Sequence, residues 1–245
     1  MPRPRALTRV VLVEDHALFA ESLDVALTLE GYDVHRIPVS SSTGSASLLF
    51  PAILRTHPHI VLLDLDLGAA GNGARLIEPL ARSGVFVAVV TASAEAARWG
   101  ECLRYGARTV LCKTAPLNSI LSTVRRLNEG LPVMSREERE SLLRTYQQEK
   151  NEMQQVRVRL EELTPRERDI LGHLMDGHAV RDIARIGVVS EATVRTQVKS
   201  ILAKLNVSSQ LAAVGAAHHV NWRPTSTTRR HEMPDLGHAP PGPSS

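Results

Sequence analysis

Five polar residues share one feature: each stands at or just after the end of a short apolar run. They are Glu14, Asp15, Asp64, Thr91 and Lys113. Carboxylates held close together repel one another unless a cation lies between them. Mg²⁺ suits such a site because it binds a few carboxylates, keeps water ligands and accepts phosphoryl oxygens. With an ammonium and a hydroxyl beside them, these groups could perform phosphoryl transfer to a carboxylate.

Such chemistry needs a scaffold that brings distant segments to one place. From residue 8 to about 130 the chain alternates apolar runs with stretches that can be helical. The runs are residues 10–13, 33–37, 60–63, 86–90 and 109–112, and the helical stretches include 16–30, 74–82, 95–105 and 117–129. Near-continuous runs of Val, Ile and Leu are typical of strands buried on both faces, so the alternation predicts a doubly wound parallel sheet. Strands of such a sheet end at one edge, where ligands bind.

The composition limits the other possibilities. The chain has 245 residues, of which 43% are hydrophobic and 22% charged, which excludes a chain disordered throughout. The net charge of +3 is too small to identify a nucleic-acid partner. Cys102 and Cys112 are too few for a disulfide framework and too far apart for a CxxC pair. No apolar run approaches the length of a membrane span, so we expect a cytoplasmic protein without a membrane partner.

Residues 135–163 differ from what precedes them, because Gln, Glu and Arg dominate and Gly and Pro are absent. Apolar residues recur there at steps close to a 4-3 repeat. They are Leu142, Tyr146, Met153, Val156, Leu160 and Leu163, and Glu149 fills one position where an apolar residue is expected. A solvated linker helix and a short dimerising coiled coil both fit this pattern.

The next segment predicts a compact unit of four helices. Thr164 and Glu167 form a capping-box pattern with Pro165 at the first helical position, and this helix extends to about residue 175. Further helices are predicted at 180–186, from a Ser190 cap to about 205, and at 209–218. The second and third have helix-turn-helix spacing, in which the third enters the major groove of DNA. Residues 223–245 are predicted to be a disordered tail.

Residues 8–130 resemble the receiver domain of a two-component response regulator, on the strength of the five residues at the ends of the apolar runs. The resemblance implies that Asp64 accepts a phosphoryl group. It further implies that Glu14, Asp15 and Asp64 hold Mg²⁺, together with the backbone carbonyl of Asp66.

The same resemblance implies that Thr91 and Lys113 bind phosphoryl oxygens. Three positions depart from the usual pattern of these domains. Gly68 stands where a proline is usual, Val110 replaces an aromatic switch residue, and Thr114 replaces a proline after the lysine.

The C-terminal segment resembles the LuxR-type DNA-binding domain from residue 163 to about 217. The motifs that carry this resemblance are LTPRER at 163–168, DIA at 182–184 and VSEATV at 189–194. The resemblance implies that Arg195, Thr196 and Lys199 face bases, while Ser190 and Thr193 contact the DNA backbone. Gly187 departs from the family, which usually has leucine there.

These features predict a five-stranded flavodoxin-like receiver domain at 8–130, a helical linker at 131–162, a helix-turn-helix domain at 163–222 and a tail at 223–245. This architecture resembles the NarL-type response regulators. It implies a transcription factor, not an enzyme, that is controlled by phosphorylation of Asp64. The implied partners are a histidine kinase, a paired operator in double-stranded DNA and, in the active state, a second copy of the chain.

Three alternatives remain open from the sequence. The departures at Gly68 and Val110 favour an orphan regulator, which binds DNA but whose receiver works without phosphorylation. The helix-turn-helix could bind protein instead of DNA. Residues 63–66 also resemble the DxD nucleophile motif of haloacid-dehalogenase-type phosphatases, although two strands precede this motif here.

Overall fold

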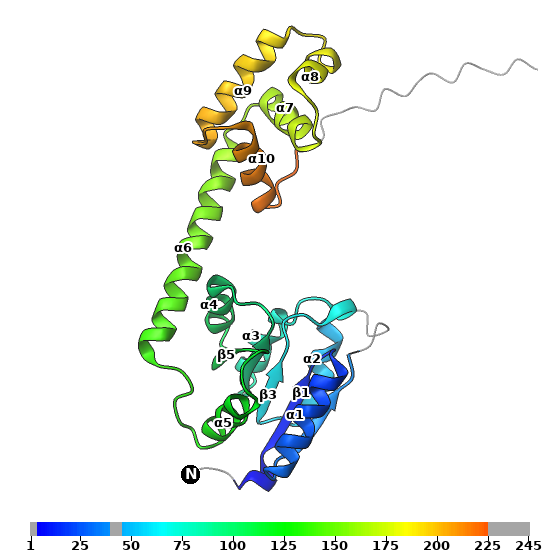
Figure 1. The fold of residues 1–245 in the computed structure, drawn as a ribbon, viewed down its shortest axis with the longest axis vertical. Coiled ribbons are helices and arrows are strands. Elements are labelled where there is room, and N and C mark those ends of the chain that lie inside the picture. Colours follow the sequence, from blue (N-terminus) through cyan, green and yellow to red (C-terminus); the bar gives the residue numbers. More distant parts are fainter. Residues whose placement is uncertain (1–3, 40–45, 225–245) are drawn as a thin grey trace, which may run out of the picture. The chain divides into compact units, whose positions relative to one another are not determined.

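The computed structural model describes residues 4–39 and 46–224. The chain divides into two compact units, Met1–Asn151 and Glu152–Ser245 (Figure 1). The first unit contains a parallel sheet with the order β2-β1-β3-β4-β5. Its strands are β1 (Arg9–Val13), β2 (Asp33–Ile37), β3 (Ile60–Leu63), β4 (Phe86–Thr91) and β5 (Thr109–Cys112). The predicted doubly wound parallel sheet is confirmed.

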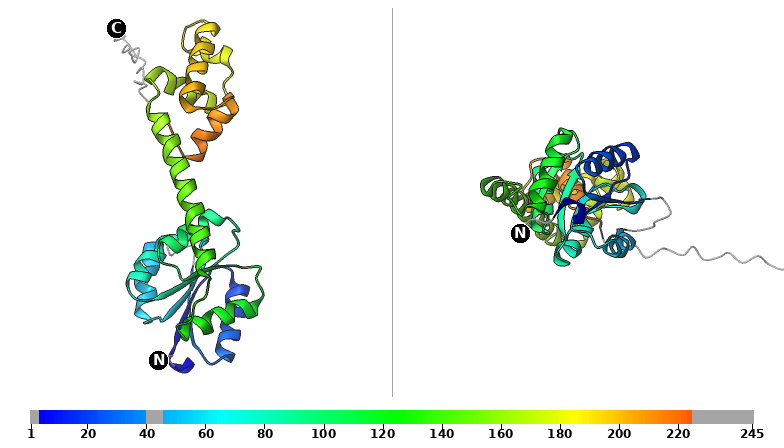
Figure 2. Two further views of the ribbon diagram at one scale, coloured as in Figure 1. Left: turned by 90° about the vertical axis from the view of Figure 1, so that its left-hand side faces the viewer. Right: turned by 90° about the horizontal axis from the view of Figure 1, so that it is seen from below.

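Helices cover both faces of this sheet (Figure 2). They are α1 (Ala17–Leu29), α2 (Ala46–Arg55), α3 (Ala74–Arg82), α4 (Ala96–Arg104) and α5 (Leu117–Asn128), with short 3₁₀ turns η1 (Arg5–Leu7) and η2 (Gly68–Ala70). Alternate residues of each central strand face opposite cores, as Val11 and Leu12 do in β1. The core on the side of Val11 includes α2, α3 and α4, and the core on the side of Leu12 includes α1 and α5. The strands are therefore buried on both faces, as their apolar runs predict.

Helix α6 (Arg136–Glu161) begins within the first unit. Its side chains Leu142 and Leu143 pack against the core that lies under α4. Arg139 donates a hydrogen bond to the carbonyl oxygen of Leu103, over 3.1 Å. These contacts fix the first turns of α6 on the receiver-like unit.

Gly100 of α4 lets α6 come this close. A Cβ at Gly100 would collide with the carbonyl oxygen of Leu142 and lie 2.7 Å from the Cβ of Tyr146. We therefore expect Gly100→Ala to lower the free energy of unfolding of the first unit by about 1–3 kcal/mol, since α6 must shift to make room. Urea unfolding followed by Trp99 fluorescence in a Trp222→Phe background measures this change.

Gly215→Ala is the matched control for that substitution. Gly215 also lies within a helix, but a Cβ there has no atom within 4 Å. We expect no loss of stability of the second unit, which contains Gly215, when unfolding is followed by Trp222 fluorescence in a Trp99→Phe background, because alanine is the better helix former. Equal stability of Gly100→Ala and the wild type would show that α6 does not depend on this close approach.

The second unit contains α7 (Pro165–Met175), α8 (Val180–Ile186), α9 (Glu191–Leu205) and α10 (Gln210–His219). The four predicted helices are confirmed. Thr164 and Glu167 form the capping box in both directions at the start of α7, and the Ser190 side chain caps α9. Their apolar faces share one core, which includes Ile170, Ile183, Val194, Val198, Ile201 and Ala213.

Most apolar residues of the predicted 4-3 repeat pack against the hydrophobic cores of the two units. Leu142 packs in the first unit, whereas Leu160 and Leu163 are buried in the second, with Met153 and Val156 against them. A coiled coil between two copies would have to compete with these contacts, and it stays a prediction.

The predicted tail, apart from residues 223 and 224, falls outside the described residues. Within residues 4–39 and 46–224, no helix combines the length and the apolar character that a bilayer span requires.

Candidate functional site

Backbone hydrogen bonds bring the predicted site residues to one edge of the sheet. The Asp64 N–H donates to the carbonyl oxygen of Val13 over 2.9 Å, because β1 and β3 are neighbours. The Lys113 N–H donates to the carbonyl oxygen of Thr91 over 2.8 Å, because β4 and β5 are neighbours. The ends of these four strands therefore meet.

The Lys113 ammonium joins two of the carboxylates. Its Nζ lies 2.7 Å from Asp64 Oδ2 and 2.7 Å from Glu14 Oε1. The Asp64 residue is only 2% exposed. Burial by itself lowers the pKa of the Lys113 ammonium, but hydrogen bonds to Asp64 and Glu14 outweigh it, so the pKa lies above its ordinary value. The lysine therefore stays charged and offsets part of the negative charge.

Oxygen ligands dominate the pocket around this lysine. Glu14, Asp15, His16 and Asp64 each offer a ligand atom, and these atoms all lie within 4.8 Å of one another. Three carboxylates at such distances suit a hard cation, for which Mg²⁺ is the usual choice beside phosphoryl groups. This is an acidic pocket typical of a magnesium-binding phosphoacceptor site.

His16 is a pocket residue that the sequence analysis missed. Its Nδ1 lies 2.8 Å from Asp15 Oδ1 and 3.0 Å from Glu14 Oε1. The hydrogen bond to Glu14 raises the pKa of the His16 imidazole, although the Lys113 charge opposes it. The one signal in the sequence was its position directly after the acidic pair. His16 is the N-cap residue that immediately precedes α1, and its ring contacts both acids.

The loop after Asp64 explains one departure from the resembled domains. Asp66 is exposed, and its N–H donates to Asp64 Oδ1 over 3.2 Å. Gly68 has a φ of +53°, which the ring of a proline cannot adopt. Gly73 is equally constrained, because a Cβ there would collide with the carbonyl oxygen of Asp64. The loop thus follows a path for which glycine, and not proline, is suited.

Thr91 ends β4 and is 2% exposed. Its Oγ1 accepts the N–H of Ser93 over 3.2 Å, and the indole N–H of Trp99 donates to the Ser93 carbonyl oxygen over 2.8 Å. Trp99 packs against the same core as Leu142 of α6. Val110 is buried in that core as well, so an aliphatic side chain occupies the position of the usual aromatic switch.

The predicted DNA-facing residues share the solvent-exposed surface of α9 and its cap. Ser190, Thr193, Arg195, Thr196 and Lys199 are all exposed. Arg195 Nη2 pairs with Glu191 Oε2 over 2.8 Å, within the same helix. Within the part of the chain that the structure describes, the Lys199 side chain makes no hydrogen bond or ion pair. Its ammonium is therefore available to an anionic or hydrogen-bond-accepting partner.

Two residues near this surface make contacts that the sequence does not indicate. Ser200 follows Lys199 in α9, but it is half-buried and donates to Glu167 Oε1 over 2.6 Å. The buried carboxylate of Glu167 draws this hydroxyl inward. At Gly187, a Cβ would collide with the Arg166 guanidinium, so glycine leaves room for this side chain where the resembled family has leucine.

The fold and the two surfaces define a class of protein: a receiver domain with an acidic pocket typical of phosphoacceptor sites, joined to a helix-turn-helix unit. Residues 10–125 match the family described as "Response regulator receiver domain", and residues 161–217 match "Bacterial regulatory proteins, luxR family". The chain belongs to the two-component, DNA-binding transcriptional response regulators of the NarL/LuxR type. Members of this family are transcriptional regulators and not enzymes, which sets the phosphatase interpretation aside.

Relatives match over most of their length. The chain is 26% identical over 208 residues to the nitrate/nitrite response regulator protein homolog of Haemophilus influenzae, covering 84% of this chain and 93% of the relative. It is 28% identical over 222 residues to the probable transcriptional regulatory protein NarL of Mycobacterium tuberculosis, covering 88% and 95%. A structure of the Salmonella typhimurium RcsB response regulator has the same fold, with a TM-score of 0.50, 19% identity and coverage of 86% and 99%.

Proposed function

We propose that Asp64 is the phosphoacceptor and that a histidine kinase supplies the phosphoryl group. The observation that carries this proposal is the buried Asp64 carboxylate, which forms an ion pair with Lys113 and lies close to two further acids. Mg²⁺ held by Glu14, Asp15, Asp64 and the carbonyl of Asp66 would offset the charge of the phosphoryl oxygens. An Asp64 oxygen would form the bond to phosphorus while the P–N bond to the phosphohistidine of the kinase breaks, so that the kinase histidine is the leaving group.

The residues beside Asp64 have distinct tasks in this proposal. The Lys113 ammonium leaves the carboxylate and binds a phosphoryl oxygen, and the Thr91 hydroxyl donates to another. Thr91 Oγ1 accepts the Ser93 N–H, so a displacement of this hydroxyl towards a phosphoryl oxygen would move the segment that Trp99 contacts through the Ser93 carbonyl oxygen. Trp99 shares a core with Leu142 and Leu143 of α6. In this proposal, these contacts transmit a change in the pocket to α6 without an aromatic residue at position 110.

We further propose that Arg195, Thr196 and Lys199 face base edges in the major groove, and that Ser190 and Thr193 contact phosphates. A single unit presents a short basic surface, so binding of two copies to a paired operator would raise the affinity. The active form in this proposal is a homodimer. Because the proposed partner is DNA, we propose that the protein acts in the cytoplasm.

The alternative is an orphan regulator that binds DNA without phosphorylation. It is favoured by Val110, whose aliphatic side chain cannot act as the usual aromatic switch. One experiment separates the two: intact-mass spectrometry of the chain after incubation with Mg²⁺ and acetyl phosphate. We expect the wild type to gain one phosphoryl group and Asp64→Asn to gain none.

Glu129→Gln is the control, because it removes an exposed carboxylate from the end of α5 and leaves every residue of the pocket unchanged. We expect this variant to be phosphorylated like the wild type. A folded wild type that gains no phosphoryl group would contradict phosphorylation control and leave the orphan regulator as the interpretation.

A further inference from the structure

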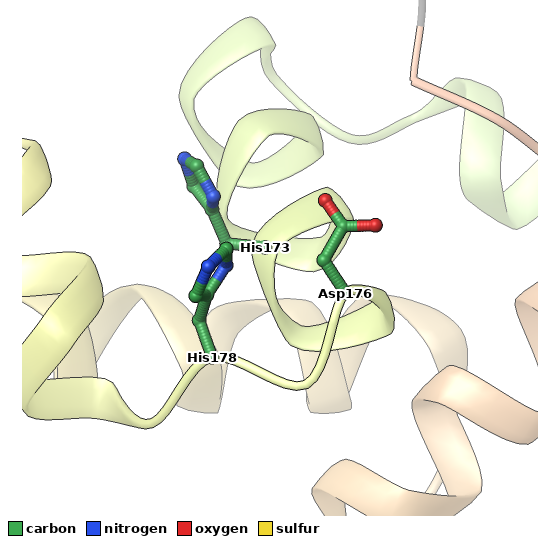
Figure 3. A group of neighbouring side chains, drawn as sticks. All are labelled: His173, Asp176 and His178. Atoms are coloured by element: carbon green, nitrogen blue, oxygen red, sulfur yellow. The ribbon is translucent and has the colours of Figure 1, made fainter.

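A second group of metal-ligating side chains lies in the DNA-binding unit, far along the chain from the acidic pocket. It consists of His173, Asp176 and His178 (Figure 3). His173 is in the last turn of α7, Asp176 directly follows the last residue of this helix, and His178 lies in the short connection to α8. Neither the receiver chemistry nor the recognition surface of α9 uses these residues.

The backbone holds the three residues together. His173 and Asp176 are three residues apart, so they lie on neighbouring positions of the helix surface. Gly177 then adopts a left-handed φ of +83°, and the His178 N–H donates to the His173 carbonyl oxygen over 3.0 Å. This turn brings the two imidazole rings edge to face, with centroids 5.3 Å apart. The three ligands therefore lie in a single hydrogen-bonded turn at the end of α7.

The three side chains are also free to bind. One ligand atom from each lies within 4.8 Å of the other two. In the stretch 165–186, which the structure describes fully, none of the three takes part in a side-chain hydrogen bond or an ion pair. His173 and Asp176 line an open cavity of about 230 Å³, whereas His178 lies outside its lining and is exposed to solvent, so water can reach all three side chains.

The donor set indicates which ion fits. Two imidazole nitrogens and one carboxylate oxygen are ligands for divalent transition metals, whereas Mg²⁺ and Ca²⁺ prefer oxygen alone. Three protein ligands leave a further position to water. Metal bonds of about 2.0–2.2 Å require ligand atoms that are less than 4.8 Å apart, so the side chains would rotate towards one another on binding.

We propose that His173, Asp176 and His178 form a binding site for a divalent transition-metal ion, with Zn²⁺ as the best match. The ion would join the end of α7 to the connection before α8, the first helix of the helix-turn-helix. Because the turn of the folded unit brings the three ligands together, the ion would bind the folded unit more tightly than the unfolded chain and stabilise it against unfolding. The proposal does not depend on phosphorylation of Asp64.

The test is thermal unfolding of the full chain, prepared without a histidine tag, with and without ZnCl₂. Trp222 packs against the core of the second unit, so its fluorescence in a Trp99→Phe background reports this unit. We expect Zn²⁺ at tenfold excess over Kd to raise Tm by about 5–10 °C. We expect MgCl₂ at the same concentration to leave this transition unchanged.

Variants distinguish this site from other histidines. His173→Gln, Asp176→Asn and His178→Gln should each remove most of the rise in Tm, whereas the double control His218→Gln/His219→Gln should keep it. The remaining histidines of the chain are the same in all these variants and cancel in the comparison. A wild type that Zn²⁺ does not stabilise would overturn the proposal, and so would an equal rise in wild type and His178→Gln.

Discussion

Replacing both Arg195 and Lys199 with alanine should lower the affinity of the chain for its operator by roughly two to three orders of magnitude. A side chain that reads a base edge through good hydrogen bonds contributes about 1–3 kcal/mol, and two such contacts would be lost. Lys199 has no partner among the described residues that it must leave before binding. Arg195 must leave only Glu191, and an exposed pair at this helical spacing contributes about 0.3–0.5 kcal/mol.

Fluorescence anisotropy at one fixed salt concentration measures this loss, with a duplex that the wild type has enriched from a random pool. The matched control is Arg136→Ala/Lys150→Ala, which removes the same two positive charges from exposed positions on α6. We expect the control to bind within about twofold of the wild type, because distant charges are screened by salt. Wild-type affinity in the Arg195/Lys199 variant would show that α9 does not read the operator.

Removing the Glu167 carboxylate should destabilise the second unit by about 3–5 kcal/mol, since the residue is buried and its partners would be left unpaired. Glu167 Oε2 accepts from the Thr164 N–H over 2.8 Å and from Lys204 Nζ over 2.7 Å, while Oε1 accepts from Ser200. Glu167 is 3% exposed. Urea unfolding of Glu167→Ala, followed by Trp222 fluorescence in a Trp99→Phe background, measures the effect.

The same carboxylate predicts a pH dependence. Burial raises the pKa of Glu167, but hydrogen bonds from Lys204, Ser200 and Thr164 outweigh it and lower the pKa from 4.5 to about 2. A carboxyl whose pKa is lower in the folded state stabilises that state fully above its unfolded pKa. This stability, roughly 3 kcal/mol for such a shift, is lost as the pH falls from about 4.5 towards 2.

Two variants test this account of Glu167. Glu167→Gln should show a weaker loss of stability over that pH range than the wild type, because its side chain does not titrate. Glu162→Ala removes an exposed neighbouring carboxylate, and we expect a change within about 0.5 kcal/mol. A Glu167→Ala variant as stable as the wild type would mean that Lys204 and Ser200 find equivalent partners.

Residues at the ends of regular elements were the easiest to predict from the sequence. The apolar runs define where each strand stops, so Asp64, Thr91 and Lys113 could be placed at one sheet edge before the structure was known. The capping box at Thr164 was predictable for the same reason, because its two partners are three residues apart. Local spacing was sufficient in both cases.

Contacts between elements were harder to predict. Ser200 turns inward because α7 places the Glu167 carboxylate beside α9, and no pattern within α9 encodes this pairing. His173 and His178 come together through a left-handed glycine, which a helical periodicity does not describe. Such features depend on packing and backbone turns, which a single sequence specifies only indirectly.

The loop between Asp64 and α3 has a consequence for how the pocket can evolve. Gly73 faces the carbonyl oxygen of Asp64, and Gly68, at a left-handed φ, faces the Asp15 carboxylate, which would lie 3.0 Å from a Cβ. Neither glycine has a reactive group, yet a side chain at either position would displace an acid of the pocket or the backbone that holds it. We therefore expect substitutions to be poorly tolerated not only at the acids but also at these two glycines, which contribute by having no side chain.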